Sequence, residues 1–196
     1  MKELGGIIVP IVTPMYEDES VNLDALRVQI DRLIAAGVHG IFCFGTNGEA
    51  YILTDEEKEA VLEATVEQVN GRVPVYAGTG CVSTNATIRM SRRAKAIGAD
   101  RIELYTGPYA EAYQNRKNDD KTWKNLLQQH ASAAAHAQAI GLGVNAGHDL
   151  NTENLPALVS ALPMLDEVSI GHALTVDALY NGLAHTIAAY KQALQH

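Results

Sequence analysis

The stretch VPVYAGTGCVSTNATIRMSRRAKAIGADRIELY, residues 73–105, decides the fold class. Its periodicity predicts a strand at 73–77, a helix at 84–97 that Gly98 ends, and a second strand at 101–105. A strand, a helix and a strand in this order predict two parallel strands joined by a right-handed crossover. The sequence therefore indicates an α/β protein with parallel strands.

The same alternation extends from this stretch to both ends of the chain. The second helix of the chain carries a capping box, formed by Thr54 and Glu57. On the N-terminal side we predict strands at 6–13 and 38–45 and helices at 22–36 and 54–69. On the C-terminal side we predict a loop at 109–121, helices at 122–140, 153–161 and 176–194, and strands at 143–146 and 167–170.

These elements make about six βα units, which predicts repeats of the TIM-barrel kind. A complete barrel of this kind has eight units and about 250 residues, whereas this chain has 196 residues. Three architectures remain open: a small six-stranded barrel, an open doubly wound sheet, and a truncated barrel that a second chain completes. Unpaired first and last strands would leave open edges, which pair with other chains. We therefore expect a homo-oligomer.

Composition and charge limit the classes of partner. The net charge of -8 argues against nucleic acid, which requires a clustered basic face. The tightest basic cluster, residues 89–95, lies on a predicted helix, so we interpret it as a solvent-exposed helix face and not as a binding patch. No signal peptide and no long apolar run are present, so we expect no membrane partner and a cytoplasmic location.

The two cysteines, Cys43 and Cys81, fall at or just after predicted strands. We interpret both as small buried hydrophobic residues, because no CxxC motif or catalytic neighbour accompanies them. We expect neither a metal ion nor a cofactor.

The first hundred residues resemble the dihydrodipicolinate synthase and N-acetylneuraminate lyase family. The motifs that carry the resemblance are IIVPIVTP (7–14), GTNGE (45–49), LTDEEK (53–58) and VPVYAGTG (73–80). The resemblance implies that the GTNGE-type loop binds the carboxylate of a pyruvate-derived substrate, a role that falls here on Thr46 and Asn47. A hydroxyl and free backbone N–H groups on a glycine-flanked turn suit a carboxylate.

From Arg101 onward the chain resembles the C-terminal part of pyridoxine 5′-phosphate synthase. The motifs are RIELYTGPYA (101–110), GLGVNAGHDLN (141–151) and DEVSIGHAL (166–174). This resemblance implies a phosphate or sulfate site at Gly147, His148, Gly171 and His172, with Glu103 lining the substrate site. Glycines let backbone N–H groups approach an anion, and helix N-termini favour one. The alternative is that both histidines only pack at strand ends.

Each half lacks residues that its own family uses. The first family uses a tyrosine pair and a Schiff-base lysine, but no lysine here follows a predicted strand, where barrel catalysis takes place. The second family carries further histidines and a glutamate on its first three strands, which are replaced here. Glu49 and Tyr76 lie where acid–base groups could lie, although helix-end and core packing explains them better.

These observations favour one domain, residues 1–196, made of a lyase-like half (1–100) and a pyridoxine phosphate synthase-like half (101–196), each with three βα units. Our leading hypothesis is an engineered chimera without an intact active site. One alternative is a working enzyme, either of vitamin B6 biosynthesis or a pyruvate-dependent aldolase or lyase. Another is an oligomeric binding or scaffold protein.

Overall fold

The computed structural model of the protein describes residues 5–81 and 83–195. Six parallel strands alternate with helices, as the sequence predicts. The strands are β1 (Ile8–Pro10), β2 (Gly40–Cys43), β3 (Val75–Gly78), β4 (Arg101–Tyr105), β5 (Gly143–Gly147) and β6 (Glu167–Ser169). The helices are α1 (Leu23–Ala35), η1 (Thr46–Gly48), α2 (Asp55–Val69), α3 (Thr84–Ile97), α4 (Gly107–Gln114), α5 (Asp120–Ala139), α6 (Leu155–Ala161), α7 (His172–Asn181) and α8 (Leu183–Ala193).

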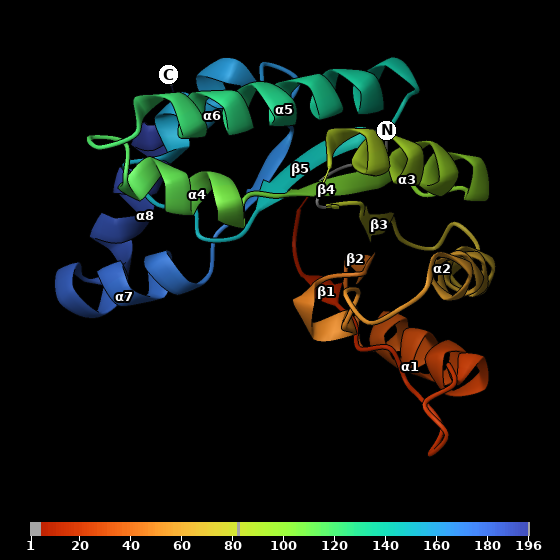
Figure 1. Cartoon of the computed structure of the whole chain (residues 1–196). Coiled ribbons are helices and arrows are strands. Elements are labelled where there is room, and N and C mark those ends of the chain that lie inside the picture. The colour runs from red at the N-terminus through yellow and green to blue at the C-terminus, as the bar shows by residue number, and fades with distance from the viewer. Residues whose placement is uncertain (1–4, 82, 196) are drawn as a thin grey trace.

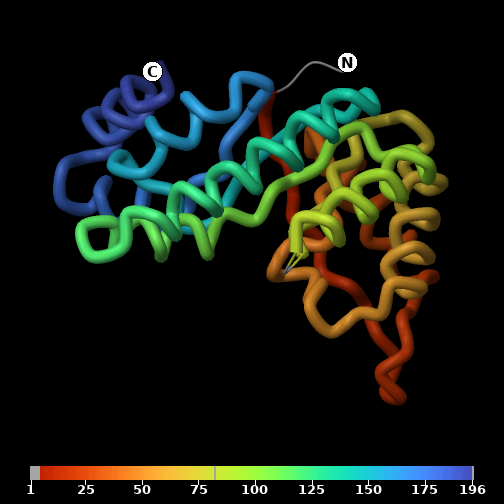
Figure 2. The backbone as a smooth tube through the Cα atoms, turned by 45° about the horizontal axis from the view of Figure 1, so that its top comes forward, coloured from red at the N-terminus to blue at the C-terminus, as the bar shows by residue number. Residues whose placement is uncertain are grey.

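The sheet is an open half-barrel. Its strands lie in chain order from β1 to β6, and each pairs in parallel with its neighbour in the sequence. The doubly wound alternative is wrong, because such a sheet reverses its strand order at a switch point. Among the described residues β1 and β6 do not pair, so a closed six-stranded barrel does not form either. Figures 1 and 2 place α7 and α8 at one end of the sheet and α1 and α2 at the other.

The two faces of the sheet differ in chemistry because successive strand residues point to opposite sides. The side chains that face the helices are apolar and buried: Ile41, Cys43, Val75, Ala77, Ile102, Leu104, Val144 and Ala146. The concave face instead carries polar side chains that neighbouring strands hold in register: Tyr76, Arg101, Glu103, Asn145 and Glu167. The main hydrophobic core therefore lies between the sheet and its helices, and the polar site lies in the barrel interior.

Side-chain caps explain where several helices begin. The capping box predicted at the start of α2 is confirmed, since Thr54 Oγ1 accepts from the Glu57 N–H at 3.2 Å and the Glu57 carboxylate accepts from the Thr54 N–H at 2.8 Å. The side chains of Asn22 and Ser83 cap α1 and α3 by accepting from the N–H groups of Ala25 and Ala86. Gly98 ends α3 at a φ of 118°, in the left-handed region that favours glycine.

The predicted loop at 109–121 is wrong over its first half. Residues 107–114 form α4, with Pro108 in the first turn, where a missing N–H costs nothing. Tyr109 is fully buried, so tertiary packing stabilises a helix that the polar run after it obscures in the sequence. The predicted single helix at 176–194 is also wrong, because Gly182 adopts a φ of 81° and separates α7 from α8.

The two cysteines lie in different environments. Cys43 is buried as predicted; burial raises the pKa of its thiol to about 12, and the thiol lies 3.4 Å from Thr65 Oγ1. Cys81 is exposed, which corrects the prediction that it is buried, because it follows β3 in the loop at the sheet edge instead of entering the core. Within the residues that the structure describes, every helix is too short or too polar to span a lipid bilayer.

Candidate functional site

The structure places the predicted site residues at the carboxyl edge of the sheet, but in two groups. Gly147 and His148 lie at the end of β5, and Gly171 and His172 follow the adjacent strand β6. Thr46 and Asn47 lie in η1 after β2, and β3 and β4 separate that strand from β5. The candidate phosphate residues therefore follow two neighbouring strands, and the candidate carboxylate residues follow a strand two positions further along the sheet.

The His148 loop has an unusual backbone conformation that a buried threonine fixes. His148 and Asp149 have φ values of 97° and 56°, which non-glycine residues rarely adopt. Thr106 Oγ1 lies 2.7 Å from the carbonyl oxygens of both Gly147 and His148, and its single hydroxyl proton is shared between them. The His148 ring lies 4.6 Å from the Tyr105 ring, and its Nδ1 is 2.9 Å from Asp149 Oδ2. The imidazole is thus oriented and partly exposed, with a carboxylate beside it.

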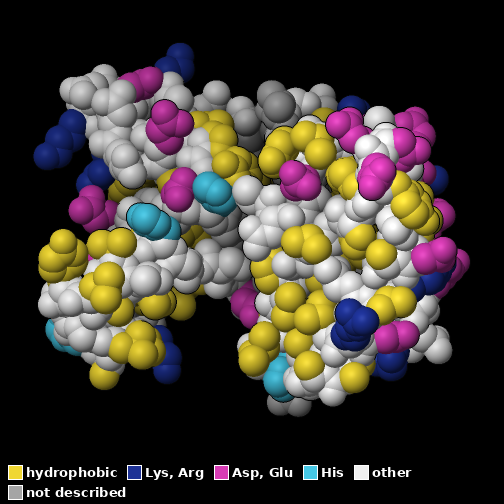
Figure 3. Space-filling view, turned by 90° about the horizontal axis from the view of Figure 1, so that it is seen from below, with side chains coloured by type: hydrophobic (Ala, Val, Ile, Leu, Met, Phe, Trp, Pro, Cys, Tyr) yellow, Lys and Arg dark blue, Asp and Glu magenta, His cyan; other side chains and the backbone are white. Residues whose placement is uncertain are grey.

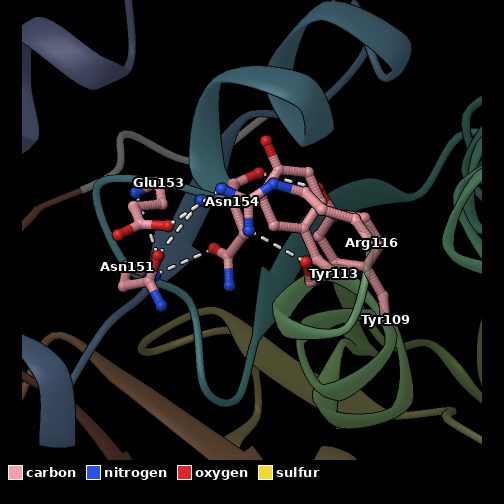
Figure 4. A network of polar contacts seen from close by, with 6 residues as sticks. All are labelled: Tyr109, Tyr113, Arg116, Asn151, Glu153 and Asn154. Atoms are coloured by element: carbon pink, nitrogen blue, oxygen red, sulfur yellow. Dashed lines mark hydrogen bonds and ion pairs between the residues drawn. The ribbon is translucent and has the colours of Figure 1, made fainter. Parts of the chain in front are cut away.

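A second set of contacts anchors the same loop to α4 and α6 (Figure 4). The buried Tyr109 hydroxyl donates to the Asn154 carbonyl at 2.7 Å, and Asn154 Nδ2 donates to the Asp149 carbonyl at 3.1 Å. Asn151 Oδ1 accepts from the Glu153 and Asn154 N–H groups at 2.9 and 3.1 Å. Residues 149–154 are therefore held by side chains at both ends of the loop.

An exposed ion pair extends this network. Arg116 Nη2 lies 3.1 Å from Glu153 Oε2, and its guanidinium carbon lies 4.3 Å from the centre of the Tyr113 ring. The sequence does not predict these contacts of α4 with the His148 loop, because its pattern indicates a loop at residues 109–121. The proline followed by tyrosines four residues apart, Tyr109 and Tyr113, is the signal that could have indicated a helix.

The two glycines of the candidate phosphate site differ in how closely other atoms surround them. A Cβ atom on Gly147 would lie 2.9 Å from Ser169 Cβ and 3.0 Å from Glu103 Oε1, so close packing requires glycine there. A Cβ atom on Gly171 would meet nothing within 4 Å. Gly171 is the N-cap of α7 and its carbonyl accepts from the Thr175 N–H at 3.0 Å, while His172 is the exposed first residue of the helix.

Glu103 lies on β4, and its side chain extends over the concave face past Gly147 on β5 to Ser169 on β6. Its Oε2 accepts a hydrogen bond from Ser169 Oγ at 2.6 Å. Burial raises the pKa of Glu103, and the charge of Glu167 raises it further, while the Ser169 bond and His148 oppose the shift. At a given pH a larger fraction of this carboxyl group is therefore protonated than of an exposed glutamate.

The concave face also holds a buried ionic network that links the two halves. Arg101 is 3% exposed, and its Nη2 lies 2.7 Å from Asp166 Oδ2. Arg101 Nε donates to Asn145 Oδ1 at 3.0 Å, and Asn145 Nδ2 donates to Glu167 Oε2 at 2.6 Å. The Tyr76 hydroxyl, from the first half, reaches the same Glu167 oxygen at 3.4 Å. Burial raises the pKa of Tyr76 to about 12, and the negative charge of Glu167 is the second cause of this shift.

The GTNGE loop is ordered by its backbone. Phe44 and Glu49, which flank the turn, have φ values of 66° and 52°, and Thr13 Oγ1 donates to the Gly48 carbonyl at 2.8 Å. Thr46 and Asn47 are exposed at its tip. Glu49 is exposed at the end of η1, as expected for a helix end. Tyr76 is buried, but it belongs to the polar network of the concave face and not to the apolar core.

A shallow pocket of about 330 Å³ opens beside His148. Its lining comprises Tyr105, Gly107, Pro108, Glu111, Gln114 and Asp149. The charged side chains in this lining are both carboxylates, so the pocket itself favours a cation over an anion. Among the described residues, no group of three or more histidine, cysteine or acidic side chains could hold a metal ion.

Comparison of the sequence with known proteins supports the resemblance of the second half. The family described as pyridoxal phosphate biosynthesis protein PdxJ matches residues 59–196. Pyridoxine 5′-phosphate synthase of Chelativorans sp. is 53% identical over 102 residues, which cover 52% of this chain and 40% of that protein. The synthase of Porphyromonas gingivalis is 54% identical over 101 residues, with the same coverage. The chain spans less than half the length of these curated relatives.

Comparison of the backbone with solved structures extends the resemblance to the other family. A dihydrodipicolinate synthase (dapA) matches with a TM-score of 0.71 and 27% identity over 93% of this chain and 61% of that one. The enzyme of Acinetobacter baumannii, crystallised with pyruvate, matches with a TM-score of 0.69 and 27% identity over 91% of this chain and 61% of that one. Both halves therefore follow one continuous barrel backbone.

The two comparisons point to different families, as the motifs of the two halves do. The match to the second family begins at residue 59, ahead of the predicted boundary at residue 100, so that boundary stays a prediction. The chain thus joins segments similar to two barrel families, and through residues 59–196 it belongs to the family of the pyridoxal phosphate biosynthesis protein PdxJ.

Proposed function

We propose that this chain is an engineered recombination of two barrel fragments that keeps a single binding function. It binds a phosphate or sulfate anion at Gly147, His148, Gly171 and His172. The observation that carries the proposal is that β5 and β6 are neighbours, so the loop of His148 and the N-terminus of α7 lie at the same edge.

The chemistry of this edge supports an anion. The first turn of a helix leaves its N–H groups without intrahelical partners, and the helix dipole favours negative charge there. The helix α7 has ten residues and begins at His172, so it offers backbone donors and an imidazole together. The relatives that match the second half are named pyridoxine 5′-phosphate synthases, a name that includes a phosphate ester.

The carboxylate of Asp149 limits the affinity. It lies 2.9 Å from His148 Nδ1 and competes with any anion for that nitrogen. The neighbouring pocket adds the carboxylate of Glu111. We therefore expect a dissociation constant on the order of 1 mM for inorganic phosphate.

Our proposal includes the loss of the active site. The second family carries its further catalytic groups on its first three strands, and residues 1–100 of this chain follow the pattern of the first family instead. Glu103 and His148 alone provide neither a complete acid–base set nor a Schiff-base lysine. Formation of pyridoxine 5′-phosphate above background would contradict this statement. Reduction with borohydride in the presence of pyruvate should leave the mass of the protein unchanged.

A histidine-resolved phosphate titration tests the binding site. The imidazole NMR signals of His148 and His172 should shift together and reach saturation, whereas that of His39, which precedes β2 at the opposite edge of the sheet, should not move. Sodium chloride at matched ionic strength is the control for screening. Uniform small shifts of all histidines, or no shift, would overturn the site.

A further inference from the structure

The two C-terminal helices form a hairpin at the open end of the sheet. They contact each other extensively, and the Tyr190 hydroxyl on α8 donates to Asp177 Oδ2 on α7 at 2.8 Å. The helix α7 buries none of its residues fully, although it follows β6, the last strand of the sheet. Figure 1 shows α7 beside the opening of the half-barrel. This helix therefore has only one side covered by its own chain.

The uncovered side is apolar. We call the exposed residues Val176, Leu179, Tyr180, Leu183 and Ile187 the α7–α8 patch; the exposed fractions reach 81% for Leu179 and 85% for Tyr180. The three on α7 and the two on α8 recur at spacings of three and four, the pattern by which a helix packs on another helix. Figure 3 shows hydrophobic side chains gathered on this end of the molecule, next to the hollow.

The geometry points to a second copy of this chain as the occupant: we propose that the α7–α8 patch forms a twofold dimer interface. The chain carries a net charge of -8, so two copies repel wherever charged faces meet. From residue 173 to residue 187 the only Asp, Glu, Lys or Arg is Asp177, and its carboxylate is hydrogen-bonded to Tyr190. This face is therefore one at which two copies can approach with little repulsion.

The size of the patch agrees with such an interface. With roughly 150 Å² for a large side chain, the five exposed fractions correspond to about 450 Å² of apolar surface. One partner contributes about 800 Å² to a standard interface, and a little over half of that area is apolar. The patch supplies this apolar part, and a twofold axis sets each patch against its own copy. This interface does not require the strand edges of β1 and β6.

Charge reversal at the patch tests the proposal. The variant Leu179→Glu/Tyr180→Glu should raise the dimer dissociation constant by roughly 100-fold, since central interface residues dominate binding. Both side chains are more than four-fifths exposed, so folding should persist, which circular dichroism would check. Tyr51→Glu is the matched control, because Tyr51 is 74% exposed after η1 and distant in the sequence. Light scattering after size exclusion measures the mass of each protein.

A cross-linking measurement separates this interface from pairing through strand edges. In a Cys81→Ser background, Leu179→Cys should form a covalent dimer with a short bis-maleimide, because a twofold axis brings each cysteine near its copy. Tyr51→Cys should not. A monomeric wild type at high concentration, an equally dimeric Leu179→Glu/Tyr180→Glu variant, or dissociation by Tyr51→Glu would each overturn the proposal.

Discussion

One buried hydroxyl group holds α4 against the segment that carries His148. Tyr109 is fully buried, and its phenol donates to the Asn154 carbonyl at 2.7 Å. Asn154 in turn holds the Asp149 carbonyl through its amide at 3.1 Å. The variant Tyr109→Phe removes the hydroxyl while the aromatic ring remains, so it isolates this hydrogen bond.

The structure sets the expected cost of that change. Without the phenol, the Asn154 carbonyl keeps only a long bond of 3.4 Å from the Leu158 N–H. Leaving a buried polar group poorly paired costs about 1–2 kcal/mol. For a chain of this size, this loss corresponds to a fall in Tm of about 3–6 °C.

Tyr113→Phe is the matched control on the same helix. The Tyr113 ring contacts Tyr109, Trp123 and Arg116, but among the described residues its hydroxyl donates no hydrogen bond. Urea denaturation with unchanged slopes should show a loss for Tyr109→Phe and almost none for Tyr113→Phe. Equal losses, or a loss below about 0.3 kcal/mol for Tyr109→Phe, would refute the assignment of stability to this bond.

Three further predictions follow from buried or titrating groups. Asp166→Asn leaves the buried Arg101 without its carboxylate partner at 2.7 Å and should cost about 2–3 kcal/mol in urea denaturation, because Asp166 itself is partly exposed; a loss below 0.5 kcal/mol would contradict it. The pKa of Glu103 is raised, so its stabilising contribution is present below about pH 4 and is lost as the pH rises through the folded-state value. Glu103→Gln should therefore raise Tm at pH 7 and not at pH 3.5, and an equal effect at both would exclude titration as the cause. A thiol reagent should modify Cys81 in the folded protein but Cys43 only after unfolding, and two reactive thiols without denaturant would contradict the burial of Cys43.

The sequence was sufficient for the order of the six strands and of most helices. The predicted helix at 84–97 and strand at 101–105 match α3 and β4 residue for residue, and the capping box of Thr54 is present. These features are local, since hydrophobic periodicity and caps depend on residues a few positions apart. The same local reasoning missed α4 and the break at Gly182, because burial of Tyr109 and a single left-handed residue decide those regions.

The candidate site was only partly predictable. The motifs placed Gly147, His148, Gly171 and His172 at the ends of two strands, and strand order made those strands neighbours. They gave no indication of Thr106, whose hydroxyl holds the His148 loop from 42 residues away. A hydrogen bond between residues this far apart leaves no spacing pattern in the sequence.

The sequence alone determined the βα alternation, the parallel strands and the two resemblances, because each depends on short continuous runs of residues. Only the tertiary structure decided that the sheet stays open, that Tyr76 of the first half reaches Glu167 of the second, and that one side of α7 is left uncovered. The physical reason is that sheet closure and burial depend on how distant segments fill a shared volume, which local periodicity does not specify.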